Sequence, residues 1–171
     1  AFLPRKFKIA VSGAAEDRAA IAWHDVGLQL LKNDAGEVGF KVYVGGGMGR
    51  TPVIGSVIKA FVPWQEILVY LEAIVRVYNR FGRRDNLYKA RIKILVKAEG
   101  QKFFDAVNAE FDKILTQDAD GREHIIPVSE LERVSRSFVD PAGVRPATNG
   151  FDPHRGGQTP PAFLRWLERN V

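Results

Sequence analysis

An amphipathic segment at residues 64–81 constrains the fold of this chain more than any other feature. Its apolar side chains recur at steps of three and four, the spacing that places them on one helix face. Pro63 precedes the segment and Gly82 follows it, as is usual at the two ends of a helix. The sequence therefore predicts a helix that buries one side against another layer. The apolar residues of that side are Trp64, Ile67, Leu68, Leu71, Ile74, Val75, Tyr78 and Phe81.

Strand-like runs precede this helix and supply such a layer. Residues 5–13 alternate apolar and polar side chains, which predicts a strand with Lys6 and Lys8 on one face. From this stretch alone, a solvated sheet face is the favoured interpretation of the two lysines. Residues 28–32 and 38–44 flank a polar turn and predict a β-hairpin.

Two segments follow the central helix. Residues 101–115 have the apolar spacing of a second helix. Residues 87–97 are ambiguous, because apolar and basic residues alternate from Ala90 to Lys97 as in a strand, while a helix face fits less cleanly. Residues 140–161, rich in proline and glycine, predict a linker or surface loop, and a last helix should start near Thr159.

Composition excludes several classes of site. The chain has 171 residues and no cysteine, so no disulfide and no thiolate-bound metal or iron–sulfur cluster can lie within it. Three widely separated histidines (His24, His124 and His154) show no zinc spacing, and we expect no metal ligands here.

No apolar run approaches the ~20 residues of a membrane helix, and no secretion signal is recognisable. We expect a cytoplasmic protein without a membrane partner. The only methionine is Met48, and we expect the chain to be part of a longer protein.

The positive charge is concentrated in the N-terminal part of the chain. Residues 1–99 hold 16 Lys and Arg against 9 Asp and Glu, whereas residues 100–171 hold 9 against 11. An anionic partner should therefore bind the first part. The candidate cations there lie in three separate clusters. They are Arg5, Lys6 and Lys8, then Arg50, and then Arg91 and Lys93.

The stretch "VGGGMGRTP" lies between two of these clusters. Gly45, Gly46 and Gly47 lack side-chain bulk, so their backbone could approach a flat or anionic ligand closely. The run matches neither the P-loop nor the dinucleotide-binding fingerprint. By itself it is more typical of a tight turn. Beside three groups of cations, it suits a ligand with many carboxylates, a small oxyanion, or both.

The motifs "LPRKFK", "GFKVYVGGGMGRTP", "YLEAIVRVYNRFGRRDN" and "KARIKILV" occur in this order over residues 3 to about 115. In sequence and spacing they resemble the sirohaem-containing sulfite and nitrite reductases. The resemblance implies an α+β fold, a mixed five-stranded sheet with helices packed on one face, and favours a helix over 87–97. It also implies a sirohaem-binding domain at 1–115 and a connecting segment at 116–171 that leads into the next, truncated ferredoxin-like half. The change to a polar, turn-rich sequence after Leu115 separately predicts a domain boundary near 116–120.

Residue roles follow from the resemblance. Lys6 and Lys8 are similar to the catalytic lysines that bind the substrate anion at sirohaem. Arg5 and Arg91 are similar to residues that pair with sirohaem carboxylates. The glycines resemble backbone that packs against the macrocycle. The implied cofactor-binding residues are Arg5, Gly45, Gly46, Gly47, Arg50, Arg91 and Lys93.

The implied activity is the six-electron reduction of sulfite to sulfide, or of nitrite to ammonia, at sirohaem coupled to a 4Fe-4S cluster. Ferredoxin or a flavoprotein would donate the electrons. The cysteine ligands of the cluster would lie outside this chain, so the chain alone should be inactive. A basic nucleic-acid-binding module is the alternative, but no RRM, KH or helix-turn-helix signature supports it. A domain without a ligand is a third interpretation.

Overall fold

The computed structural model describes residues 2–14, 16–138 and 161–170. The chain divides into two compact units, Ala1–Leu131 and Glu132–Val171. The first unit contains the sheet and the candidate site. In the second unit, helix α6 (Pro161–Asn170) confirms the predicted last helix. Its predicted start at Thr159 and nearly all of the predicted linker lie outside the described residues.

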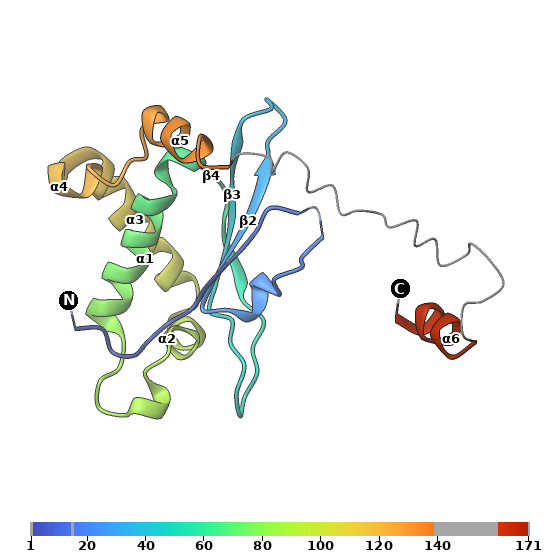
Figure 1. Cartoon of the computed structure of the whole chain (residues 1–171). Helices are drawn as coiled ribbons and strands as arrows, with labels where there is room; N and C mark the ends of the chain where they lie inside the picture. The colour runs from blue at the N-terminus through green and yellow to red at the C-terminus, as the bar shows by residue number, and fades with distance from the viewer. Residues whose placement is uncertain (1, 15, 139–160, 171) are drawn as a thin grey trace. The chain divides into compact units, whose positions relative to one another are not determined.

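A mixed sheet forms one layer of the first unit (Figure 1). The strands lie in the order β1-β2-β3-β4, with β1 parallel to β2 and every other neighbouring pair antiparallel. β2 and β3 form the predicted hairpin, in which Lys32 pairs with Val38. The described residues form four strands, where the resemblance implied five. The strands are β1 (Ile9–Ser12), β2 (Val26–Lys32), β3 (Val38–Val44) and β4 (Ser56–Pro63).

Helices α1 and α2 pack on the sheet, and α3 packs against both of them on the same side, which confirms the predicted α+β class (Figure 1). The predicted helix at 64–81 begins as a 3-10 turn, Trp64–Glu66, and continues as α1. The predicted helix at 101–115 is α3. The first unit contains α1 (Ile67–Phe81), α2 (Ile92–Glu99), α3 (Gln101–Gln117) and α4 (Ala119–Arg122), and α5 (Val128–Ser135) crosses its C-terminal boundary.

The core lies between the sheet and the helices, and α1 contributes most to it. Tyr70 and Tyr78 of α1 are fully buried, and the Tyr70 ring meets the Phe111 ring of α3 edge to face at 5.0 Å. Leu68 and Phe81, which the predicted apolar side included, are about half exposed at 47% and 55%. The difference arises because α1 packs against both the sheet and α3. The buried side of the helix is therefore wider than the predicted stripe, and it does not include these two residues.

The first strand is shorter than predicted. β1 begins at Ile9, so Lys6 and Lys8 precede the strand and do not share a strand face. The reason is that the backbone N–H of Lys8 donates to the carboxylate of Asp25 at 3.1 Å instead of to a neighbouring strand. Regular pairing starts only at the Lys8 carbonyl oxygen, which accepts from the N–H of Val26 at 3.1 Å.

The helix predicted over 87–97 is confirmed only in its second half. Residues Leu87–Lys89 form a 3-10 turn, capped by the side chain of Asn86, which accepts from the N–H of Tyr88 at 3.0 Å. Arg91 is extended (φ −72°, ψ 153°), and α2 starts after it. The hydroxyl of Tyr78 donates to the Ala90 carbonyl oxygen at 2.8 Å and so interrupts helical pairing at this point.

The first unit extends beyond residue 115. Arg76 of α1 pairs with Glu72 at 2.8 Å, as the four-residue spacing predicts, and with Asp118 at 2.6 Å. The Asp118 side chain also caps the start of α4, where it accepts from the N–H of Gly121 at 2.9 Å. These contacts fasten the end of α3 and the start of α4 to α1. The separate roles proposed for 1–115 and 116–171 stay a prediction.

Candidate functional site

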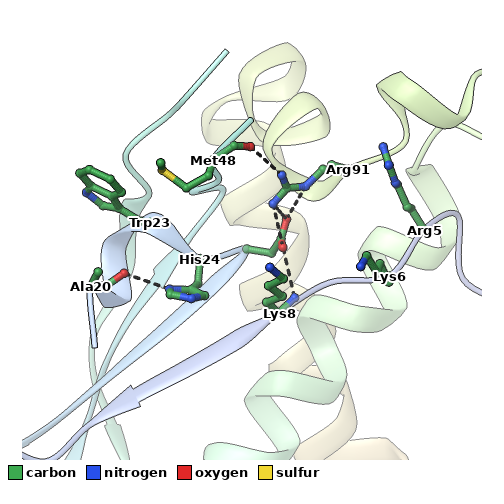
Figure 2. Close-up of a pocket in the computed structure, with 9 residues that line it drawn as sticks. Arg5, Lys6, Lys8, Ala20, Trp23, His24, Met48 and Arg91 are labelled. Atoms are coloured by element: carbon green, nitrogen blue, oxygen red, sulfur yellow. Dashed lines mark hydrogen bonds and ion pairs between the residues drawn. The ribbon is translucent and has the colours of Figure 1, made fainter. Parts of the chain in front are cut away.

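A pocket of about 390 Å³ opens where the segment before β1 passes the start of α2 (Figure 2). It combines cationic side chains with apolar surface. Trp23 is 47% exposed and Met48 is 54% exposed, so both offer apolar surface to a ligand. The lining residues are Arg5, Lys6, Lys8, Ala20, Trp23, His24, Asp25, Met48 and Arg91.

The segment before β1 is held mainly through its backbone. The carbonyl oxygen of Arg5 lies 3.0 Å from the hydroxyl of Tyr78, and the Lys8 amide is bound by Asp25 as described above. The Arg5 guanidinium donates to the carbonyl oxygen of Leu87 at 2.8 Å. Lys6 and Lys8 are exposed, and within the described part of the chain their ammonium groups form no ion pair. Both charges therefore stay available to an anion.

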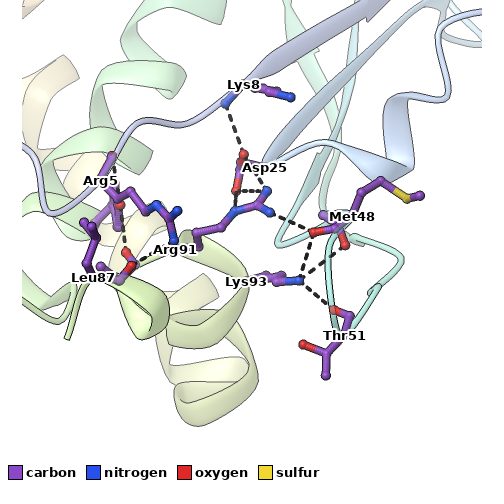
Figure 3. A network of polar contacts seen from close by, with 11 residues as sticks. Arg5, Lys8, Asp25, Met48, Thr51, Leu87, Arg91 and Lys93 are labelled. Atoms are coloured by element: carbon purple, nitrogen blue, oxygen red, sulfur yellow. Dashed lines mark hydrogen bonds and ion pairs between the residues drawn. The ribbon is translucent and has the colours of Figure 1, made fainter.

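Asp25 anchors the pocket. Its side chain is only 2% exposed and forms an ion pair with Arg91 at 2.9 Å (Figure 3). The Nε and Nη2 atoms of Arg91 donate to both carboxylate oxygens, and Nη1 donates to the Met48 carbonyl oxygen at 2.9 Å. The backbone carbonyl of Asp25 also accepts from the N–H of Gly45 at 2.9 Å. One acidic residue thus joins the segment before β1, the glycine loop and the start of α2.

The charge balance of the pocket follows from this pair. Because Asp25 neutralises Arg91, the net positive charge facing the pocket comes from Arg5, Lys6 and Lys8. Arg91 has five N–H donors, and the bonds to Asp25 and Met48 leave one of them for a ligand.

Lys93 lies behind the pocket and holds the glycine loop (Figure 3). Its side chain is buried, at 6% exposure, and Nζ donates to the carbonyl oxygens of Thr51 at 2.6 Å, Met48 at 3.3 Å and Gly47 at 3.5 Å. Burial, and then the nearby charge of Arg91, lower the pKa of Lys93. All three N–H donors of the ammonium group thus point at loop carbonyls.

The three glycines are needed for close packing within the protein. Gly45 has φ +84°, which favours glycine. A Cβ at Gly46 would lie 2.3 Å from the carbonyl oxygen of Ala22, and a Cβ at Gly47 would lie 2.6 Å from Arg91 Nη2. The glycine run therefore lets the loop pass directly beneath the turn before β2 and beside the Arg91 guanidinium.

The structure brings some of the predicted site residues together and separates others. Arg5, Lys6, Lys8 and Arg91 line one pocket, while Gly45, Gly46, Gly47 and Lys93 support it from behind. Arg50 is exposed and does not line this pocket. Sequence reasoning missed Asp25 and His24. The signal for Asp25 was an acid immediately before a buried strand, which is too common to single out.

Comparison with known proteins identifies the family of this chain. Residues 1–115 match the model of the nitrite and sulphite reductase 4Fe-4S domain. This chain belongs to the nitrite and sulphite reductase family.

Several relatives illustrate the similarity. The chain is 40% identical over 122 residues to the sulfite reductase (ferredoxin) of Synechococcus elongatus, covering 67% of this chain and 20% of that protein. It is 35% identical over 113 residues to the sulfite reductase (NADPH) hemoprotein beta-component of Myxococcus xanthus, covering 61% and 20%. The solved structure of the Mycobacterium tuberculosis NirA protein matches with a TM-score of 0.60 and 31% identity, covering 66% and 20%. The chain thus spans about a fifth of the length of these proteins.

The described residues include no group of three or more His, Cys, Asp or Glu side chains placed to hold a metal ion. Nor does any helix among them have the length and apolar character needed to cross a membrane.

Proposed function

We propose that this chain is the anion- and cofactor-binding part of a reductase that converts sulfite to sulfide, or nitrite to ammonia, by six-electron transfer. The observation that carries the proposal is the pocket with three cations, Arg5, Lys6 and Lys8, that form no ion pair within the described ranges of the chain. Family membership supports the class of reaction. The alternative of a nucleic-acid ligand has no support from the relatives, which are named as sulfite reductases.

The pocket suits sirohaem in its chemistry. Sirohaem is a flat macrocycle with a rim of carboxylates, so its site must offer both apolar surface and several cations. The half-exposed Trp23 and Met48 offer the first, and the cations of the same pocket offer the second. When bound, sirohaem supplies the iron centre at which the oxyanion is reduced.

We assign the charged residues different roles in this site. Lys6 and Lys8 bind the substrate anion and donate hydrogen bonds to its oxygens, because their ammonium groups are exposed and form no ion pair with any acidic residue that the structure describes. Arg5 pairs with carboxylates of the macrocycle, and Arg91 does so through its remaining N–H donor. Arg50, at the tip of the glycine loop, is a further carboxylate partner.

Gly45, Gly46, Gly47 and Lys93 keep the loop under the cofactor site in place. Their proposed contribution to cofactor binding is thus the shape of the loop, which brings its backbone and Met48 to the pocket.

The 4Fe-4S cluster of the proposed enzyme needs ligands from elsewhere. The chain has no cysteine, and thiolates are the usual ligands of such clusters. We therefore propose that the chain alone reduces neither sulfite nor nitrite. Ferredoxin or a flavoprotein is the proposed electron donor, by analogy with relatives whose names include ferredoxin or NADPH.

The roles of Lys6 and Lys8 are tested in the reductase that contains this chain. Lys8→Met and Lys6→Met should each lower turnover by roughly 10²–10³-fold, the usual loss when a positioned donor is removed. Sirohaem content, measured from visible absorbance, should stay near that of the unmodified enzyme. Lys32→Met is the matched control, because Lys32 is an exposed lysine at the far end of β2. Unchanged turnover in both pocket variants would contradict the assignment.

A further inference from the structure

His24 lines the same pocket, but the proposed function gives it no role. Its ring nitrogen Nδ1 lies 2.9 Å from the carbonyl oxygen of Ala20 (Figure 2). A carbonyl oxygen can only accept a hydrogen bond, so Nδ1 must carry a proton. Consequently Nε2 is the ring nitrogen at which a proton is gained or lost.

The backbone around His24 fixes the position of the ring. His24 ends the short 3-10 turn at Ile21–Trp23, and its N–H donates to the Ile21 carbonyl oxygen at 3.2 Å. Its own carbonyl oxygen lies only 2.6 Å from the position that a Cβ on Gly46 would occupy. The backbone of His24 is thus held by the turn and the glycine loop, and its ring is oriented by the bond to Ala20.

The charged groups lining the pocket leave Nε2 without an acidic partner. Arg5, Lys6 and Lys8 face the pocket from the segment before β1, and Arg91 faces it from the start of α2. Asp25 is the acidic residue among the described lining residues, and its carboxylate already accepts bonds from Arg91 and from the Lys8 amide. A proton on Nε2 would therefore find its acceptor in a bound anion.

The geometry points to His24 as a proton-carrying ligand of the anion. Because Nδ1–H is bound to the Ala20 carbonyl oxygen, the ring can donate to an anion oxygen only from Nε2–H, so a bound anion favours the form of His24 that carries both protons. This inference rests on the proposed function, because it requires the anion to sit in this pocket. A charge-assisted hydrogen bond of this kind changes affinity by about tenfold.

Binding of sulfate to the 171-residue chain tests the inference. Sulfate is the probe because its charge stays constant across the range in which imidazole side chains titrate. Isothermal titration calorimetry at about pH 5.5 and about pH 8 brackets this range. Each titration is repeated in buffers that differ in ionisation enthalpy, which reports the number of protons taken up on binding.

Two substitutions of His24 keep a hydrogen-bond donor at one position of the ring but remove the group that can gain a proton. His24→Gln places an amide donor near Nε2 that cannot titrate, and His24→Asn keeps a donor to the Ala20 carbonyl. His124→Gln is the control, because His124 is exposed and lies outside the pocket. The unmodified chain and the control should bind sulfate about tenfold more weakly at the higher pH. In a further titration at about pH 7 they should take up a fraction of a proton on binding, at most about one half for a tenfold change in affinity. Both His24 variants should lose the pH dependence and the proton uptake.

The possible outcomes separate this inference from the proposed function. If both His24 variants keep the pH dependence and the proton uptake of the unmodified chain, the role of His24 is overturned and the anion site remains. If sulfate binds with equal affinity to the unmodified chain and to a chain with both Lys6→Met and Lys8→Met, the pocket is not the anion site, and both proposals fail.

Discussion

Substitution of Asp25 by asparagine should destabilise the first unit by about 3 kcal/mol, at the lower end of the roughly 3–5 kcal/mol lost when one partner of a buried ion pair is removed. The carboxylate is 2% exposed and accepts from Arg91 and from the backbone of Lys8. Asparagine keeps the shape and one oxygen acceptor, but it leaves the Arg91 charge without a counterion. The Arg91 side chain is 22% exposed, so water relieves part of this penalty.

Urea unfolding of the chain, followed by circular dichroism, measures this loss. Fluorescence is a poorer probe here, because Trp23 lines the pocket beside Asp25. Asp85→Asn is the matched control, since Asp85 pairs with Arg83 in solvent, and the unfolding midpoint should not move. A loss below about 1 kcal/mol for Asp25→Asn, the usual size of a surface pair, would refute the conclusion that this ion pair anchors the pocket.

Two further substitutions test the supports of the site. Gly46→Ala should lower the free energy of unfolding by about 3 kcal/mol, because its Cβ would lie 2.3 Å from the Ala22 carbonyl oxygen. Gly13→Ala is the control, since its Cβ would have no neighbour nearer than 3.8 Å, and it should have little effect in the same urea titration. Tyr78→Phe should lower it by roughly 1–3 kcal/mol, because the Ala90 carbonyl loses a buried donor. Tyr88→Phe at an 85% exposed position is the control, and equal midpoints for these two variants would contradict the role given to the Tyr78 hydroxyl.

The long elements of the fold could be predicted because their apolar spacing is decisive. The segments that became α1 and α3 repeat this pattern over several turns. The start of β1 and the residues before α2 could not be predicted in the same way. There, a carboxylate distant in sequence accepts from the Lys8 amide, and the Tyr78 hydroxyl donates to the Ala90 carbonyl oxygen. Tertiary hydrogen bonds of this kind leave no periodic trace in the sequence.

The cations of the candidate site could be predicted from the sequence, but the contacts that hold the pocket together could not. Clusters of lysine and arginine are visible in the sequence, and four of the six predicted cations line one pocket. Asp25 and Arg91 are 66 positions apart in the sequence, and the residues that flank them do not indicate that they form a pair. The glycine run was predicted to approach a ligand, and the sequence could not show that its bare backbone packs against Ala22, Val96 and Arg91.

The anchoring of the segment before β1 has a consequence for how such a site can diversify. This segment is fastened through main-chain atoms, namely the Arg5 carbonyl, the Lys8 amide and the Lys8 carbonyl. Main-chain anchors do not depend on side-chain identity, so the exposed ammonium groups of Lys6 and Lys8 can be exchanged without disturbing the framework. Selection can therefore change the charge that this segment presents to the pocket at little cost in folding stability.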